Sequence, residues 1–503
     1  MDKRFPRLVY NPVSALGALI AVIAALTFLL LLGLTLSGRF EGNPYYGIFV
    51  YLVVPAFLLP GLILIPLGMW REARRRRREG ETEIPAWPRI DLNKPHTRNA
   101  AIVFVIGTVV FLLMTAVGSN GAYEYSESVN FCGKTCHVIM LPEYTTYHNS
   151  PHARVACAQC HVGPGADWFV KSKLSGAYQV YATLMKKYPR PIPTPVHNLR
   201  PAQQTCEQCH WPGRIWGAQQ KVFHHFKYDD ANTEVPITLL LKVGGGDPAK
   251  GQPAGIHWHM NVGVKVEYIP RDDRRQDIPW IRVTDRQTGR QTIYQDKEKP
   301  LTAAEVAAAK PRTMDCVDCH NRPSHRYRTP DDLVDEALWT GNVDPKLPGI
   351  KRALVSAIAA DYGSDAEAER GIANAVTETY RKEHPEVLKT QELALNKAVL
   401  AAQEAYRENM FPAMKARWDV YPDNIGHLRN LGCMRCHNSS HVSDQGQPLT
   451  TACTTCHTIT SQGTGPTLQA SNGPDGLPFV HPEDIGDAWK ETACSECHTG
   501  KQP

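Results

Sequence analysis

Residues 157–161 read CAQCH, in which two cysteines are separated by two residues and followed at once by a histidine. This arrangement recurs until all 14 cysteines of the 503-residue chain are used, in seven pairs. The pairs are Cys132/Cys136, Cys157/Cys160, Cys206/Cys209, Cys316/Cys319, Cys433/Cys436, Cys453/Cys456 and Cys494/Cys497, followed by His137, His161, His210, His320, His437, His457 and His498. Only the first, CGKTCH, has three residues between its cysteines. Chance does not produce seven such repeats, so these motifs decide the fold.

The motif C-x-x-C-H is the attachment site of a c-type haem. The two thiols hold the haem covalently, and the adjacent histidine becomes the proximal ligand of its iron. Zinc sites and disulfides also use paired cysteines, but neither requires a histidine directly after every second cysteine. The sequence therefore predicts seven haems c, attached on the exported side of a membrane.

Further histidines are candidates for the second axial position of each iron. The seven proximal histidines leave 20 − 7 = 13 others. Those within reach of a motif are His152, His197, His325, His427, His441 and His481. His257 and His259, in the strand-like segment GIHWHM, are predicted to share one further position, and Met140 offers either a thioether to the first haem or ordinary packing. We expect His96 and His384 to be solvated, and His148, His224 and His225 have no predicted role.

The first 120 residues predict a membrane anchor. Three stretches lack any charged residue, between Arg7 and Arg39, between Glu41 and Arg71, and between Arg98 and Glu124. Each is longer than the roughly 20 apolar residues that span a bilayer. The spans are predicted at residues 14–37, 46–69 and 99–119, and the second contains Pro55, Pro60 and Pro66, which should bend it.

The distribution of charge predicts the topology of the anchor. Arg71 and the run Arg74–Arg78 lie in the segment 71–98 between the second and third spans. The positive-inside rule places this segment in the cytoplasm, so residues after about 120 are exported. Residues 1–100 hold 13 Lys+Arg and 7 Asp+Glu, which leaves 55 − 13 = 42 against 50 − 7 = 43 in the remainder. A nearly neutral body argues against nucleic-acid binding, which needs clustered positive charge.

Motif spacing and residue periodicity predict five segments. They are the anchor 1–120, a haem domain 121–215 with haems 1–3, a β-containing segment 216–330 with haem 4, a helical segment 331–420, and a triple-haem domain 421–503 with haems 5–7. Residues 235–300 alternate apolar and polar residues, which predicts a small antiparallel sheet with a turn at DRQTGRQ. Residues 365–410 predict two helices, with Pro385 between them. The fold class is thus a membrane-anchored multihaem cytochrome c with a mostly helical or irregular body, packed around its haems, and a small β insertion.

Residues 100–212 resemble the NapC/NirT/NrfH cytochromes, which are membrane-anchored quinol dehydrogenases. The resemblance rests on CHVIM, SPHARVACAQCH, DWFVKSKLSGAYQVY and CEQCHWP. Family members typically have one anchor helix and four or five haems, so the three spans and seven motifs are more similar to the long inner-membrane ImcH type of metal-reducing bacteria. In the family a methionine lies two residues after the first motif histidine, whereas Met140 lies three after His137.

The resemblance implies a menaquinol site at the membrane surface. A lysine in the helix after the second motif serves that site in the family, and the matching residue is Lys173, with Lys171 second. Lysines on a solvated helix face would look the same. Oxidation of a quinol releases two protons as well as two electrons, so titratable groups are needed nearby. Glu124, Tyr125 and Glu127 follow the third predicted span and are candidates to accept the protons.

Three functions are compatible with these features. The first is a periplasmic relay from menaquinol to soluble electron carriers, such as periplasmic cytochromes, in anaerobic respiration at the bacterial inner membrane. The second is a substrate reductase, which is disfavoured because no C-x-x-C-K motif occurs and spare histidines are plentiful. The third is a subunit of a larger respiratory or photosynthetic complex without its own quinone site, docked through the first two spans.

Overall fold

The computed structural model describes residues 7–36, 53–80, 91–134, 137–163, 165–196, 199–245 and 255–501. It divides into two compact units, Met1–Thr135 and Cys136–Pro503, which we describe separately. His197 and Cys136 lie outside the described residues, and the side chain of His137 is likewise not described.

Three helices of the first unit are long and apolar enough to cross a membrane, as predicted. They are α1 (Pro12–Leu36), α3 (Val54–Arg78) and α4 (Pro95–Ser126). The helix that contains the second predicted span extends beyond residue 69 to Arg78, because the arginine run continues α3. Arginine has a high helix propensity, so nothing in this run ends the helix. Likewise α4 continues past residue 119 and contains Glu124 and Tyr125, with Glu127 as its C-cap.

Helices α1 and α3 pack closely through small residues. A Cβ atom added to Gly17 would lie 2.7 Å from the carbonyl oxygen of Gly61, and one added to Gly61 would lie 2.8 Å from the backbone nitrogen of Ala21. Small residues allow two membrane helices to approach in this way. The hydroxyl of Ser14 donates a 2.8 Å hydrogen bond to the carbonyl of Ile65, next to Pro66 inside α3. The contact surface of this pair therefore tolerates no larger side chain at either glycine.

The second unit contains two antiparallel sheets where the sequence predicted one. One sheet has the order β1-β2-β8-β9 and the other β6-β3-β4-β5-β7. Their strands are β1 (Gln219–Phe226), β2 (Glu234–Leu241), β3 (Val264–Ile269), β4 (Trp280–Asp285), β5 (Gln291–Asp296), β6 (Arg312–Thr313), β7 (His441–Ser443), β8 (His457–Gln462) and β9 (Gln469–Ala470). The predicted turn at DRQTGRQ joins β4 to β5. The histidine segment Ile256–Met260 is a 3-10 helix instead of a strand, so β2 and β3 belong to different sheets.

The C-terminal segment is not separate from the β-containing segment. Strand β8 pairs with β2, and β7 pairs with β5. Both sheets therefore combine residues from before and after the helical segment, so residues 421–503 share their hydrogen-bonded framework with residues 216–330. The sequence pattern could not reveal these long-range pairings, because β7 and β9 are only two or three residues long.

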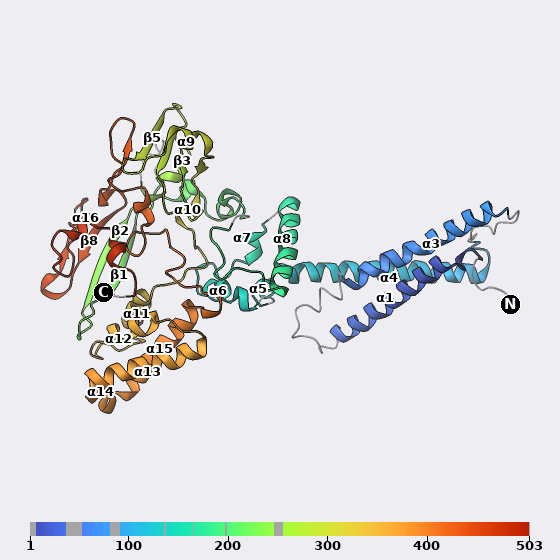
Figure 1. The fold of residues 1–503 in the computed structure, drawn as a ribbon, viewed down its shortest axis with the longest axis horizontal. Helices are drawn as coiled ribbons and strands as arrows, with labels where there is room; N and C mark the ends of the chain where they lie inside the picture. Colours follow the sequence, from blue (N-terminus) through green and yellow to red (C-terminus); the bar gives the residue numbers. More distant parts are fainter. Residues whose placement is uncertain are drawn as a thin grey trace. The chain divides into compact units, whose positions relative to one another are not determined.

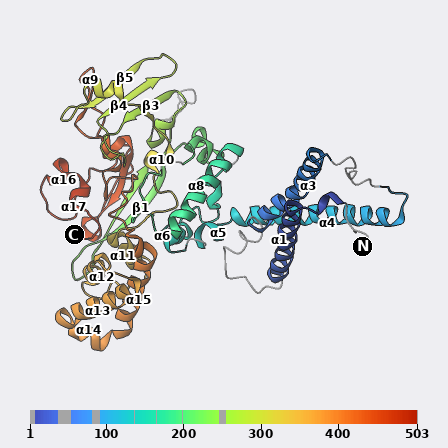
Figure 2. The ribbon, with the colours of Figure 1, turned by 45° about the vertical axis from the view of Figure 1, so that its right-hand side comes forward.

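Helices α11 to α15 form the main apolar core (Figure 1). They are α11 (Pro330–Trp339), α12 (Ile350–Ala359), α13 (Asp365–Glu383), α14 (Pro385–Thr390) and α15 (Glu392–Asn409). Pro385 begins α14, and a second break before Glu392 gives three helices where the sequence predicted two. His384, at the junction of α13 and α14, was predicted to be solvated, but it is half-buried and its Nε2 is shielded from solvent. The two views in Figures 1 and 2 both place α13, α14 and α15 side by side.

The remaining described helices are short, apart from α8. Most of them carry or flank a haem motif. They are α5 (Val129–Lys134), α6 (His137–His148), α7 (Cys157–His161), α8 (Ala166–Leu184), α9 (Ala303–Ala308), α10 (Cys316–Cys319), α16 (Ala488–Glu491) and α17 (Cys494–Cys497).

A buried ionic network ties the helical core to the C-terminal segment. The ammonium of Lys351, only 2% exposed, lies 2.8 Å from Asp331 and 2.6 Å from Asp335. Arg429 pairs with the same Asp331 and, at 2.8 Å, with Asp332. Burial opposes ionisation of Asp331, but the charges of Arg429 and Lys351 outweigh it and lower the pKa of this carboxyl. The network thus fixes helix α11 between α12 and the loop that carries Arg429.

We expect Lys351→Met to destabilise the second unit strongly. The change leaves two buried carboxylates without their shared cation, a loss that costs about 3–5 kcal/mol. Unfolding of the full-length protein by guanidinium, followed through the haem absorption, measures this effect. Lys346→Met on the exposed loop before α12 is the control, and we expect it to change stability by less than about 0.5 kcal/mol. Equal stability of the two variants would contradict the role of the network.

Candidate haem centres and the lysines of helix α8

Each described haem motif forms about one helical turn. Four of the motif histidines donate their backbone N–H to the carbonyl of the first cysteine, at 2.7–3.0 Å; they are His210, His320, His437 and His498. Residues one turn apart lie on the same face of a helix. The turn therefore presents both thiols and the imidazole together, as covalent attachment and proximal ligation of one haem require.

Six motif histidines face a second histidine from elsewhere in the chain. The ring centroids are 5.8–6.3 Å apart in every pair. The pairs are His161 with His325, His210 with His152, His320 with His257, His437 with His259, His457 with His427, and His498 with His481. Two imidazoles on opposite sides of one metal, with bonds of about 2.0–2.1 Å, place their centroids roughly 6 Å apart. The spacing fits a metal between the rings.

Hydrogen bonds orient most of the second histidines for ligation. The Nδ1 atoms of His257, His259, His325 and His481 lie 2.6–3.0 Å from backbone carbonyl oxygens. For His152 the corresponding distance, to the carbonyl of Pro323, is 3.3 Å. A bond from Nδ1–H to a carbonyl leaves the lone pair of Nε2 available to a metal. The side chains of His257, His259 and His325 are thus oriented as Nε2 ligands, whereas Nδ1 of His481 also lies 3.2 Å from the backbone nitrogen of Glu483.

Burial favours the neutral, metal-binding form of several of the paired imidazoles. Burial lowers the pKa of His325 to about 4. Burial is also the main cause of a lowered pKa at His259, His320, His427, His457 and His498. A ligating histidine must be unprotonated, so this environment favours iron binding over the whole physiological pH range.

The structure does not support His441 as an axial ligand. Its Nδ1 lies 2.7 Å from the side-chain oxygen of Asn438, and its Nε2 lies 2.7 Å from the carbonyl of Ile278. Both ring nitrogens thus lie within hydrogen-bond distance of protein oxygen atoms, and the residue is 2% exposed. His441 thus links the start of β7 to Ile278, in the segment before β4, by a hydrogen bond. His441 and His427 both lie within a few residues of the fifth motif in the sequence, and of these two His427 is the one that faces a motif histidine.

His257 and His259 occupy two positions, whereas the sequence predicted one shared position. The prediction assumed a strand, in which residues two apart point to the same face. The segment is instead a 3-10 helix. Two residues along a 3-10 helix are rotated by roughly 240°, which turns the two rings in different directions. His257 therefore faces His320, and His259 faces His437.

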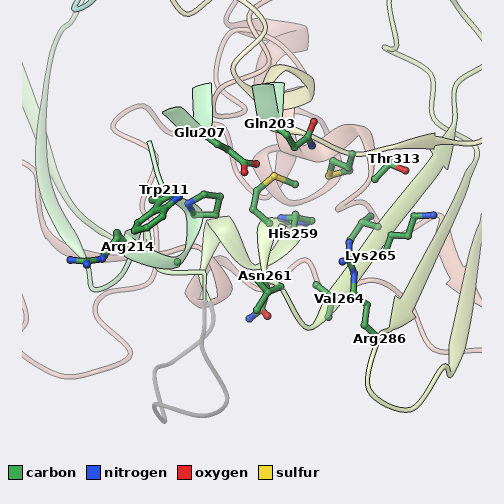
Figure 3. A pocket seen from close by; sticks show the side chains of 16 residues that line it. Gln203, Glu207, Trp211, Arg214, His259, Asn261, Val264, Lys265, Arg286 and Thr313 are labelled. Carbon is green, nitrogen blue, oxygen red and sulfur yellow. The ribbon is translucent and has the colours of Figure 1, made fainter. Parts of the chain in front are cut away.

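A cavity of about 490 Å³ borders His259. Apolar side chains of Met260, Val264, Val266 and Met314 contribute to its lining, together with the cationic Arg214, Lys265 and Arg286. Figure 3 shows His259 near the centre of this lining, with Trp211 and Arg214 on one side and Lys265 on the other. Apolar walls with cationic groups suit a flat macrocycle that carries carboxylates. The described residues thus fit haem c in ligand chemistry, ring spacing and cavity character.

The first haem site is described only in part. Cys132 lies in the turn α5, and Met140 lies in α6, where it packs against the main apolar core. His148, to which the sequence assigned no role, is exposed at the end of α6, and its ring centroid lies 4.5 Å from that of Tyr144 and 5.0 Å from that of Tyr147. The packing of Met140 agrees with the apolar alternative, and the predicted distal candidate His197 lies outside the described residues.

The two candidate quinol-site lysines lie near the start of helix α8. The ammonium of Lys171 lies 4.7 Å from the ring centre of Trp168, and that of Lys173 lies 4.8 Å from that of Phe169. Lys171 is exposed and Lys173 is half-buried. Aromatic faces stabilise ammonium groups while leaving their donors partly available.

Ring orientation allows individual pairs to be tested by spectroscopy. The planes of His257 and His320 are 5° apart, whereas those of His259 and His437 are 84° apart. Parallel imidazoles split the iron d orbitals more than perpendicular ones, so the two pairs should give different low-spin EPR signals. We expect His257→Met to remove a rhombic signal and His259→Met to remove one with a large maximum g value. His441→Gln, the matched control, should leave every signal in place, and its loss of one would overturn the assignment.

Comparison with known proteins agrees with these features. Residues 94–192 match the family model described as the NapC/NirT cytochrome c family, N-terminal region. The chain is 44% identical over 492 residues to the cytochrome c-type protein ImcH of Geobacter sulfurreducens, a match that covers 97% of this chain and 95% of that protein. It is also 27% identical over 115 residues, or 22% of this chain, to the cytochrome c-type protein NrfH of Wolinella succinogenes, of which it covers 63%. No solved structure matched the chain. The chain therefore belongs to the NapC/NirT family of membrane-anchored c-type cytochromes and is of the long type represented by ImcH.

Proposed function

We propose that this cytochrome takes electrons from menaquinol and relays them through seven haems c to periplasmic electron carriers in anaerobic respiration. The six histidine pairs with ring centroids about 6 Å apart are the observation that carries the proposal. Haem c, when bound, supplies reversible one-electron transfer at its iron. A second imidazole at each of these positions leaves no room for a substrate there, which favours a relay over a substrate reductase.

Contacts between motifs support a continuous route. The side chains of Cys206 and Cys316, of the third and fourth motifs, lie close enough for each to shift the pKa of the other. The other four steps from the second to the seventh motif link cysteines in a similar way. In each, the pKa of one thiol is raised mainly by burial and further by a cysteine of the neighbouring motif. These links join Cys160 to Cys206 and Cys209, Cys319 to Cys433, Cys456 to Cys433, and Cys494 to Cys453. The second to seventh motifs thus follow one another in space in the order of the sequence.

Lys173 and Lys171 are the proposed quinol-site residues. An ammonium group beside a quinol oxygen stabilises the ionised form of that oxygen and so helps the first proton to leave. Glu124, whose carboxylate accepts a 3.0 Å hydrogen bond from Asn120, and Tyr125 are exposed in the last turn of α4, with the half-buried Glu127 after them. We propose these groups as acceptors of the released protons. The arginine run of α3 then faces the cytoplasm, and the haem-bearing unit faces the periplasm.

The quinol site can be tested by mixing the oxidised protein with a menaquinol analogue in a stopped-flow spectrometer. We expect Lys173→Ala to slow haem reduction at least about tenfold, because a positioned acid–base group contributes on that scale or more. Lys171→Ala should have a smaller effect, and Lys186→Ala, beyond the end of α8, serves as the control. Reduction by dithionite should be unchanged in all three variants.

The same experiment decides between the relay and the alternative function. Spans α1 and α3 form a closely packed pair whose outer faces are apolar, and such a pair could dock into a larger respiratory or photosynthetic complex. Ready reduction by dithionite without any reduction by quinol would mean that electrons come from a protein partner.

The surface around the seventh motif suits a basic electron acceptor. A cavity of about 390 Å³ beside His481 is lined by Val480, Ile485 and Trp489 together with Glu483 and Asp484. Residues 475–500 hold one lysine and six acidic residues, a net charge of 1 − 6 = −5. An apolar centre with a charged rim is the usual design of a transient interface, in which the charges speed association. We propose that electrons leave here to a cationic periplasmic cytochrome.

Charge reversal at this surface should slow electron delivery. We expect Asp484→Lys with Glu491→Lys to reduce the rate constant for a basic monohaem cytochrome c about tenfold at low ionic strength. For the unchanged protein the rate should fall as salt is added, because added ions screen the attraction. Glu404→Lys, on α15, is the control. A rate that does not depend on salt would argue against the cationic partner.

A further inference from the structure

Helix α8 exposes an apolar face. Val170, Leu174, Tyr178, Tyr181 and Leu184 are 55%, 68%, 65%, 45% and 67% exposed. They follow one another at intervals of four, four, three and three residues. That spacing places all five on one side of the helix, in a single stripe.

The side of α8 that the protein partly covers carries mainly small residues after the first turn, in which Trp168 and Phe169 are half-buried. Ser172, Ser175 and Gly176 are half-buried, and Ala182 is 6% exposed. A helix on the surface of a water-soluble domain has the reverse pattern, with its apolar stripe turned inward. Helix α8 therefore exposes large apolar side chains and covers mostly small residues, which is unfavourable if its outer face is in contact with water.

Positive charge borders the stripe. Lys171 and Lys173 flank its first turns, while Lys186, Lys187 and Arg190 follow its end. Asp167 is the only acidic residue between 165 and 190, so the net charge of this segment is 5 − 1 = +4. Helices that lie on membranes combine an apolar stripe with cationic borders in this way, and tyrosine is enriched at the interface.

We propose that α8 lies in the interface of the bilayer, with this stripe against the acyl chains and its cations among anionic headgroups. The chain itself brings α8 close to a membrane in sequence, because α4 ends at Ser126 and α8 begins at Ala166. The proposal needs the membrane anchor but not quinol oxidation. It gives the haem-bearing unit a second attachment to the bilayer besides the covalent one.

The proposed position also gives Lys173 a defined depth. Lys173 lies at the border of the stripe, one position before Leu174. A lysine at such a border keeps its stem among apolar groups and its ammonium at headgroup level. If the proposed quinol site is correct, the quinol headgroup would meet Lys173 at that level while its isoprenoid tail stays in the bilayer.

Lipid photocrosslinking of the full-length protein tests the proposal. The protein is placed in nanodiscs of phosphatidylcholine and phosphatidylglycerol, in which part of the phosphatidylglycerol carries a diazirine on its acyl chain. After illumination, mass spectrometry maps the modified residues. We expect adducts on Leu174, Tyr178 and Leu184, as well as on α4, which serves as the positive control. Leu400 on α15 is 66% exposed and should remain unmodified, because it faces water.

Two matched variants separate lipid contact from mere exposure. Leu174→Glu should lower adduct formation on α8 about fivefold or more, since a carboxylate is repelled by an anionic interface. Leu400→Glu should leave it unchanged, and covalent haem content measured for both variants shows that they are folded. Adducts confined to α1, α3 and α4 in the unchanged protein would overturn the proposal and mean that protein or haem covers the stripe. No quinol is present, so this result is independent of the proposed activity.

Discussion

The structure depends on the pairing of a motif histidine with a second histidine from a distant part of the chain. His161 and His325 are brought together across the whole β-containing segment, and His320 and His257 clamp the 3-10 helix Ile256–Met260. An iron between two imidazoles acts as a crosslink, and crosslinks over long loops remove the most entropy from the unfolded chain. Long irregular segments can therefore hold a defined path here with little regular structure.

The cysteines and the proximal histidine of each haem could be predicted from the sequence, but the second histidine that faces each motif could not. The motif fixes which cysteines and which histidine serve one haem, because covalent geometry requires them within a single turn. The second ligand is chosen by the fold. His325 follows the fourth motif closely but faces the histidine of the second, and His441 follows the fifth but turns its nitrogens to Asn438 and Ile278. Proximity along the chain is thus a poor guide where tertiary contacts select the ligand.

Element boundaries show the same division. Absence of charge located all three membrane helices, because no polar group is tolerated in hydrocarbon without a partner. It could not locate their ends, since arginine and glutamate continue a helix as well as leucine does. Likewise Pro385 marked a helix start, whereas strand β8, which begins at the motif histidine His457, pairs with β2 more than 200 residues earlier. Pairings of that length leave no local signal.

The second unit carries its positive and negative charge in different segments, which affects how it would be oriented at a membrane in the proposed relay. Residues 101–503 are nearly neutral as a whole, yet residues 165–190 carry a net +4 and residues 475–500 a net −5. Opposite charges at two sites do not cancel when the sites lie more than a Debye length apart, about 8 Å at physiological salt. The cationic segment attracts an anionic bilayer and the acidic one repels it, so both charges favour the same orientation. In the proposed arrangement the acidic surface stays open to a soluble cationic partner, while the apolar stripe of α8 contacts the membrane.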